Sequence, residues 1–153
     1  MNSFKLKIPP AALLLFCIGL MWAIHEFIQI EMLLFDSERY IVRVLLVLGV
    51  IIGILGVTEF SRRSTTVNPH KPQKTTTLVR SGIYRLTRNP MYLGMAIILL
   101  AGMVKFGNGI NIIVIPLYIW VMNTVQIQPE EEVMEQKFGQ KYLAYKKEVR
   151  RWL

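Results

Sequence analysis

The chain has 153 residues, which is enough for one domain, and 53% of them are hydrophobic, with a mean hydropathy of +0.40. This composition excludes an ordinary soluble domain, which needs a more polar shell at this size. The formal net charge of +8 could suggest nucleic acid as a partner. We expect none, because the chain has no nucleic-acid-binding motif and membrane topology explains where its basic residues fall.

Four stretches of the sequence lack Asp, Glu, Lys and Arg. A helix needs roughly 20 mainly apolar residues to cross the hydrocarbon core of a bilayer. We therefore predict an all-α integral membrane protein with about four transmembrane helices, over residues 8–27, 40–60, 91–104 and 110–127. The third is short, and the break at Lys105–Gly109 predicts a tight helical hairpin between the third and fourth.

The first apolar stretch could also belong to a cleaved signal peptide, since Lys5 and Lys7 precede it. No small-x-small cleavage motif comes before His25 and Glu26, so we predict a retained helix. Its single cysteine, Cys17, cannot form an internal disulfide, and we expect it to serve packing.

Two features of the first two spans carry alternative interpretations. Gly49 and Gly53 have the spacing that lets membrane helices approach closely, and we predict packing there. An acid within a span is a candidate functional residue, but His25 and Glu26 fall at the outer end of the first span, where water reaches them. We expect Glu59, at the end of the second span, to anchor that helix or pair with Arg62 or Arg63, and a place in a site is the lesser alternative.

The distribution of Lys and Arg predicts the orientation of the spans. Fifteen of the 18 basic residues fall before the first span, between the second and third, or after the fourth. We therefore expect a multi-pass protein, of the cell inner membrane, with both termini in the cytosol. The chain reads as a single domain over 1–153, with a cytosolic loop over 61–90.

The end of that loop carries the first candidate site. Pro90 suits the first turn of a helix, and Asn89 before it is a good N-cap. The free N–H groups of a helix start favour an anion, so Arg88 and Tyr92 beside it make a plausible site for a carboxylate-bearing ligand.

After the fourth span, Pro129 followed by three glutamates predicts the start of a C-terminal amphipathic helix over 129–151. Six residues form one apolar face of that helix: Met134, Phe138, Tyr142, Tyr145, Val149 and Trp152. If the third and fourth spans are antiparallel, Glu130 and Asn89 meet at the same height, and polar groups converge at the membrane interface.

The ordered motifs of this half resemble the isoprenylcysteine carboxyl methyltransferase family and related phospholipid methyltransferases. They run Leu78-Val79-x-Ser81-Gly82-Ile83-Tyr84, Arg88-Asn89-Pro90-Met91-Tyr92-Leu93-Gly94, Glu130-Glu131 and Phe138-Gly139-x-x-Tyr142-x-x-Tyr145. The resemblance extends from about Pro69 to Trp152. It implies S-adenosyl-L-methionine as methyl donor, held by the cytosolic loop, the start of the third span and the C-terminal helix, with no metal.

The resemblance also implies which residues bind the cofactor. They are Thr77, Leu78, Val79, Tyr84, Asn89, Pro90, Met91, Tyr92, Glu130 and Glu131. Asn89 stands where many members have His. Gln126 stands where the prenylcysteine enzymes carry an Arg that is thought to hold the substrate carboxylate, so Arg88 and Gln126 are the candidates for positioning the acceptor.

Because Asn89 and Gln126 depart from the family's residues, the sequence predicts a membrane-soluble acceptor and leaves its chemistry open. The acceptor is an isoprenylcysteine-type or other carboxylate, an amine or a thiol. Three other classes stay open: a four-helix transporter using Glu26, a glutathione-dependent four-span enzyme and a non-catalytic membrane scaffold. Proton flux lost on Glu26→Gln would indicate the first, and glutathione binding the second. The oligomeric state does not follow from the sequence.

Overall fold

A computed structural model describes residues 8–28, 30, 38–62 and 75–153 of the chain. Three helical runs are long and apolar enough to cross a membrane: α1 (Pro10–Phe27), α2 (Glu38–Arg62) and the run Gly109–Phe138. A fourth apolar helix, α3 (Pro90–Phe106), is shorter. The predicted all-α membrane architecture is confirmed.

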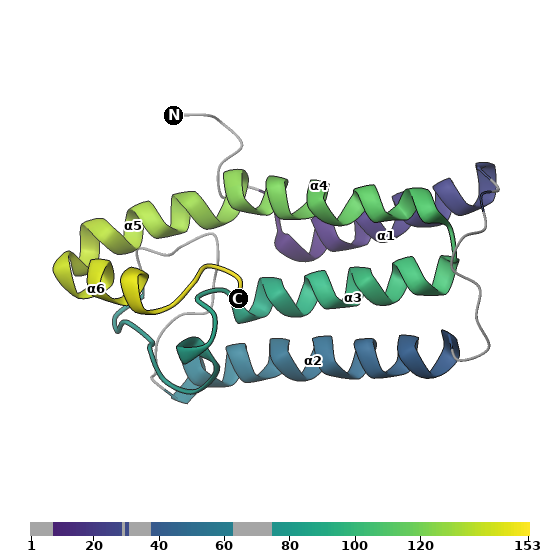
Figure 1. The fold of residues 1–153 in the computed structure, drawn as a ribbon. Helices are drawn as coiled ribbons and strands as arrows, with labels where there is room; N and C mark the ends of the chain where they lie inside the picture. Colours follow the sequence, from purple (N-terminus) through teal and green to yellow (C-terminus); the bar gives the residue numbers. More distant parts are fainter. Residues whose placement is uncertain (1–7, 29, 31–37, 63–74) are drawn as a thin grey trace.

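Helix α3 lies between α2 on one side and α1 and α4 (Val114–Val121) on the other, and neighbours along the chain run in opposite directions (Figure 1). The end of α2 and the start of α3 therefore share one end of the molecule. The short 3-10 helix η2 (Gly82–Arg85) and helices α5 (Gln128–Phe138) and α6 (Gln140–Glu148) gather there. We call residues 75–89 and 128–153 together the cap.

Helices α2 and α3 approach closely at paired glycines. A Cβ on Gly49 would lie 2.7 Å from the carbonyl oxygen of Gly94, and one on Gly94 would lie 2.5 Å from that of Gly49. Neither position has room for a side chain, which confirms the packing role predicted for Gly49. Gly53 differs, because its Cβ position has no neighbour within 4 Å.

At the end opposite the cap, polar side chains tie α1 to the hairpin between α3 and α4. Asn108 Nδ2 donates to the carbonyl oxygen of Ile28, and Asn111 Nδ2 donates to that of Met21 at 3.3 Å. Gly107 ends α3 in the left-handed conformation, with φ 64°. The Cys17 side chain is 2% exposed in the core beside Met21, as its predicted packing role requires.

The fourth span and the C-terminal segment differ from the prediction. The chain is helical without interruption over Gly109–Phe138, so the expectation that Pro129 starts a separate helix is wrong. A π-helical turn, η4 (Met122–Ile127), lies just before it. Pro129 has no N–H to bond the carbonyl four residues earlier, and a widened turn accommodates that loss. The single helix expected over 129–151 is two helices, divided at Gly139 with φ 51°.

Candidate functional site

The carboxylate of Glu130 joins the apolar helices to the cap. Its Oε1 accepts a hydrogen bond from the hydroxyl of Tyr92 and another from Nε2 of Gln126, both at 2.6 Å. Tyr92 stands in the first turn of α3, while Gln126 belongs to the π-helical turn η4. Both donors are buried, at 4% and 2% exposed. Residues far apart in the sequence thus converge on one carboxylate at the membrane-side boundary of the cap.

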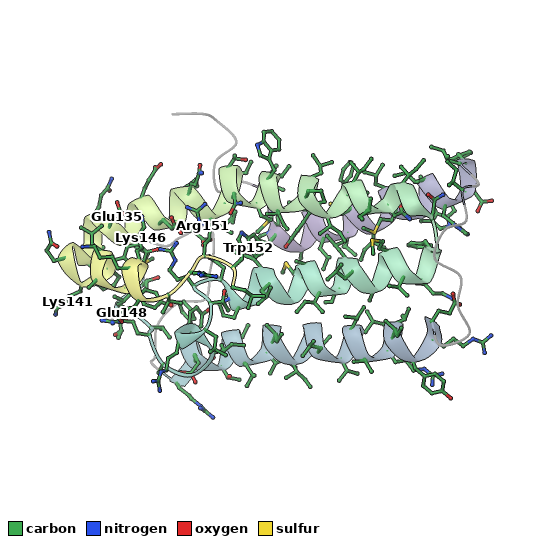
Figure 2. The ribbon with its side chains drawn as sticks, in the orientation of Figure 1. Glu135, Lys141, Lys146, Glu148, Arg151 and Trp152 are labelled. Carbon is green, nitrogen blue, oxygen red and sulfur yellow. The ribbon has the colours of Figure 1, made fainter. Side chains whose placement is uncertain are left out.

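The neighbouring Glu131 has a different environment, because three cations surround it. The guanidinium of Arg151 donates two hydrogen bonds to its carboxylate, from Nε to Oε1 at 3.0 Å and from Nη2 to Oε2 at 2.8 Å. Arg88 Nη2 lies 3.1 Å from Oε1, and Lys146 Nζ lies 3.8 Å from Oε2. Lys146 also pairs with Glu135, so α5, α6 and the C-terminal residues are joined by ion pairs (Figure 2). Glu131, 6% exposed, therefore organises the cap.

Two buried side chains of the cap carry polar atoms that no described residue satisfies. The Arg88 side chain is 9% exposed, and its Nε and Nη1 have no hydrogen-bond partner among the described residues. The hydroxyl of Tyr84, a residue 4% exposed, has none in that part of the chain either. A buried donor left without a partner costs about 1–3 kcal/mol, and more when it is charged. Such atoms in a folded protein call for a ligand or bound water.

Charged groups act in different senses on two neighbouring tyrosines of the cap. Burial, and then the charges of Tyr145, Glu130 and Glu59, raise the pKa of Tyr84 well above its usual range. Burial also raises the pKa of Tyr145, but there Arg88 acts in the opposite sense. Acidic groups thus act on the Tyr84 hydroxyl, whereas Arg88 and Arg80 act on that of Tyr145, which donates to the carbonyl oxygen of Tyr84 at 2.7 Å.

A C-terminal segment, Arg150–Trp152, lies against the start of α3. The backbone N–H of Arg88 donates to the carbonyl oxygen of Arg150 at 3.0 Å. The carbonyl oxygen of Arg151 accepts from Asn89 Nδ2 at 2.9 Å and from Thr87 Oγ1 at 3.2 Å. Asn89 is the N-cap residue of α3 as predicted, but its side chain makes no capping bond, because its amide donates to this segment. Asn89 therefore holds the C-terminal segment in place.

The remaining predicted site residues lie in varied surroundings. Val79 is buried at 5% exposed, and Leu78 packs against the cluster of Tyr142, Tyr145 and Val149 that Met134 and Phe138 complete. Thr77 is exposed at the surface. Pro90 and Met91 face Gly56 of α2, where they serve helix packing. The structure thus brings together Arg88 with Glu131, and Tyr92 with Gln126 and Glu130, but leaves Thr77, Pro90 and Met91 apart from these groups.

Sequence reasoning missed several contacts of the cap. Thr87, 1% exposed, bonds the backbone N–H of Asn89 as well as the C-terminal segment. The indole N–H of Trp152 donates to Asn123 Oδ1 at 3.1 Å, and its ring packs against the core of the spans, away from the apolar face predicted to hold it (Figure 2). The sequence indicated a role for Asn123 only through its position, because it lies one turn from Gln126 in a span otherwise poor in polar residues.

Comparison with known proteins places this site in a sequence family. The phospholipid methyltransferase family matches residues 38–141. An uncharacterised protein of Haemophilus influenzae is 44% identical over 63 residues, which are 41% of this chain and 100% of that protein. No solved structure matches.

Two eukaryotic relatives carry functional names. A probable protein-S-isoprenylcysteine O-methyltransferase of Oryza sativa subsp. indica is 29% identical over 110 residues, 72% of this chain and 58% of that protein. The protein-S-isoprenylcysteine O-methyltransferase of Schizosaccharomyces pombe is 29% identical over 107 residues, 64% of this chain and 45% of that protein. The chain thus spans about half the length of these two relatives. The family match covers more than half of the chain, from the start of α2 into α6, and includes Arg88, Tyr92 and Glu130; the chain belongs to the phospholipid methyltransferase family.

Proposed function

We propose that the protein is an integral membrane methyltransferase that uses S-adenosyl-L-methionine to methylate a lipophilic acceptor at the cytosolic face of the membrane. The observation that carries the proposal is the pair of buried guanidinium nitrogens of Arg88, which no residue in the described part of the chain satisfies. The names of the rice and fission-yeast relatives support methyl transfer as the reaction class.

The residues of the cap fit the charges of such a cofactor, which bears a carboxylate, an ammonium and a sulfonium. Nε and Nη1 of Arg88 are the donors for the carboxylate, since Nη2 already serves Glu131. Glu130 suits the cationic groups, because Tyr92 and Gln126 orient its carboxylate with uncharged donors. The hydroxyl of Tyr84 is a further polar atom available to a ligand in this region.

The chemistry needs little acid or base from the protein. The cofactor, when bound, supplies a methyl group already activated by the positive sulfur. The chain's task is then to hold donor and acceptor in line and to exclude water, which in favourable cases lowers a barrier by about 7–11 kcal/mol. Tyr92, Gln126 and Glu130 form a rigid boundary between the apolar spans and the polar cap. The C-terminal segment, bonded to Thr87 and Asn89, closes the side of the cap next to α3.

The distribution of charge supports a cytosolic position for the cap. Ten basic residues lie at that end of the described structure, against Arg39, Arg43 and Lys105 at the other. An acceptor dissolved in the bilayer would reach Glu130 from the apolar spans, while a water-soluble cofactor would reach Arg88 from the cytosol.

The transporter alternative finds no support in the position of Glu26. Its side chain is exposed at the end of α1 away from the cap. The neighbouring His25 ring contacts Phe106, with 5.7 Å between ring centroids. An acid at the rim of the spans is not placed to couple protons to transport through their interior.

Methyl transfer from labelled cofactor tests the proposal. The protein is reconstituted in nanodiscs of a bacterial lipid extract and incubated with S-adenosyl-L-methionine labelled in its methyl group. Label is expected in the organic phase with the wild type and not with Arg88→Met. A wild type that is folded by thermal unfolding yet transfers no label would contradict the proposal.

A further inference from the structure

The C-terminal segment, Arg150–Trp152, bridges the start of α3 and the π-helical turn η4. It has no regular secondary structure. The carbonyl oxygen of Arg151 accepts from the side chain of Asn89 at the start of α3. The indole N–H of Trp152 donates to the side chain of Asn123 on η4 (Figure 2). The segment therefore crosses the seam between these two elements.

This seam lies beside the carboxylate that joins the spans to the cap. The two donors to Glu130 are Tyr92 on α3 and Gln126 on η4. Each of them follows by three residues the side chain that holds the segment on the same element, Asn89 and Asn123 respectively. A molecule that moves from the bilayer to Glu130 along this seam must pass the indole of Trp152.

On its other side, α3 is closed off by backbone contacts with α2. The backbones of Gly49 and Gly94 leave no room for a side chain at either position. Nearer the cap, a Cβ on Gly56 would lie 2.9 Å from Cγ of Met91 and 3.2 Å from Cγ of Pro90. An apolar chain cannot pass between α2 and α3 without separating the two helices, so we expect entry on the side of α3 that faces α4 and η4 (Figure 1).

Side chains, in contrast, close the seam between α3 and η4. Among the described residues, Trp152 is the only residue of the cap that packs against the apolar core of the spans. Its side chain is partly buried. A side chain can withdraw from such a position by rotation, whereas two helices in backbone contact cannot part as easily.

The two ends of the C-terminal segment are held unequally. The carbonyl oxygens of Arg150 and Arg151 together accept three hydrogen bonds, and the guanidinium of Arg151 donates two more to Glu131. Trp152 makes one hydrogen bond to the described part of the chain, through its indole. The indole can therefore leave its position while Arg151 stays bound, which makes Arg151 a hinge.

We propose that the C-terminal segment is a gate, with Arg151 as its hinge and Trp152 as its moving part, and that this structure shows the gate closed. The inference rests on the proposed methyl transfer to a membrane-soluble acceptor. In the closed position the indole separates the bilayer from Glu130. An acceptor that enters along the seam displaces the indole, and its apolar chain takes over the contacts with the core of the spans.

Trp152→Ala tests the gate, because a gate and a purely structural anchor predict opposite changes. If only a small fraction of the protein is open, the apparent affinity for the acceptor is reduced by that fraction. The assay is transfer of label from S-adenosyl-L-methionine in nanodiscs, with the mole fraction of bacterial lipid extract in synthetic phosphatidylcholine varied. We expect Trp152→Ala to raise kcat/KM for the extract by about threefold or more.

The controls separate this effect from a change in cofactor binding or folding. S-adenosylhomocysteine should bind Trp152→Ala and wild type within about a factor of two. Trp120→Ala, at a position 64% exposed on α4, is the matched control and should leave the transfer rate unchanged. Asn123→Ala keeps the ring but removes its hydrogen-bond partner, so it should also raise kcat/KM, and it replaces Trp152→Ala if that variant does not fold.

The fluorescence of Trp152 gives a readout that needs no transfer. The chain has three tryptophans, so Trp152 alone emits in Trp22→Phe/Trp120→Phe. Phosphatidylcholine has no free amine, thiol or carboxylate and offers no acceptor. With S-adenosylhomocysteine bound, acrylamide should quench Trp152 about twofold or more strongly in nanodiscs of the extract than in phosphatidylcholine. Trp22→Phe/Trp152→Phe, in which only Trp120 emits, should show equal quenching in the two lipids.

Several outcomes would overturn the inference. Unchanged or slower transfer by the folded Trp152→Ala or Asn123→Ala protein, with S-adenosylhomocysteine binding intact, would make Trp152 an anchor alone. Equal quenching of Trp152 in the two lipids would show that the segment does not open. A wild type that transfers no label would instead contradict the proposed function, and the quenching measurement would then decide whether the segment opens.

Discussion

The hydroxyl of Tyr92 donates a 2.6 Å hydrogen bond to the carboxylate of Glu130, across 38 positions of the sequence. This bond joins the start of α3 to the start of α5, at the boundary between spans and cap. An antiparallel third and fourth span predicts that the motif at the start of α3 and the motif at the start of α5 meet at one end of the molecule. Helices α3 and α4 do run in opposite directions (Figure 1).

Removing that hydrogen bond should weaken cofactor binding. A hydrogen bond to a charged group contributes roughly 1.5–3 kcal/mol, so Tyr92→Phe should raise the Kd of S-adenosylhomocysteine by about tenfold or more. Tyr118→Phe is the matched control, because its hydroxyl makes only a 3.4 Å bond to the carbonyl oxygen of Tyr92. Equal affinities in titration calorimetry for Tyr92→Phe and wild type would show that Glu130 does not depend on Tyr92.

The close approach of α2 and α3 predicts a difference between two glycines of the same helix. Gly49→Ala places a methyl group 2.7 Å from the carbonyl oxygen of Gly94, and overpacking of this kind typically costs about 1–3 kcal/mol. Gly53→Ala meets open space and should leave stability unchanged or slightly improved. Thermal unfolding in the same detergent compares them, and equal midpoints would contradict the packing described.

Glu131 should matter for folding more than for chemistry. Glu131→Gln leaves Arg88 and Arg151 without their buried counter-charge, and breaking such a pair costs roughly 3–5 kcal/mol. We expect a large fall in the thermal midpoint, whereas Glu132→Gln, at an exposed neighbouring position, should change it little. A stable Glu131→Gln protein would mean that the three cations have other partners.

The C-terminal segment should respond to loss of one indole hydrogen bond. Trp152→Phe keeps an aromatic ring in the core but removes the bond to Asn123 Oδ1. We expect faster hydrogen exchange at residues 149–152, because the segment loses one of the bonds that hold it and keeps those to Thr87, Arg88, Asn89 and Glu131. Trp120→Phe, at an exposed position on α4, is the control. Unchanged exchange in Trp152→Phe would contradict the anchoring role.

The sequence predicts much of this architecture because apolar stretches and basic flanks obey strong physical rules. The spans, Gly49 packing and the meeting of Glu130 with the start of the third span, predicted at Asn89, follow from such rules. The hydrogen bond of the Asn89 side chain does not follow from them, because its partner is a backbone carbonyl 62 residues away. The separate helix predicted to start at Pro129 was wrong, because proline suits a widened turn within a longer helix as well as a helix start. The hydrogen bond from Ser81 to Glu59 could not be predicted, because it forms only when the end of α2 packs beside the cap.

Titration calorimetry with S-adenosylhomocysteine, on the nanodisc-reconstituted wild type and on Arg88→Met, tests the central claim most directly. Arg88 offers two buried donors that have no partner among the described residues, and Met preserves an unbranched side chain without the charge. We predict binding near one to one for the wild type and at least a tenfold loss for Arg88→Met. A folded wild type that does not bind, or an Arg88→Met protein that binds equally well, would contradict the assignment of the cap as a cofactor site.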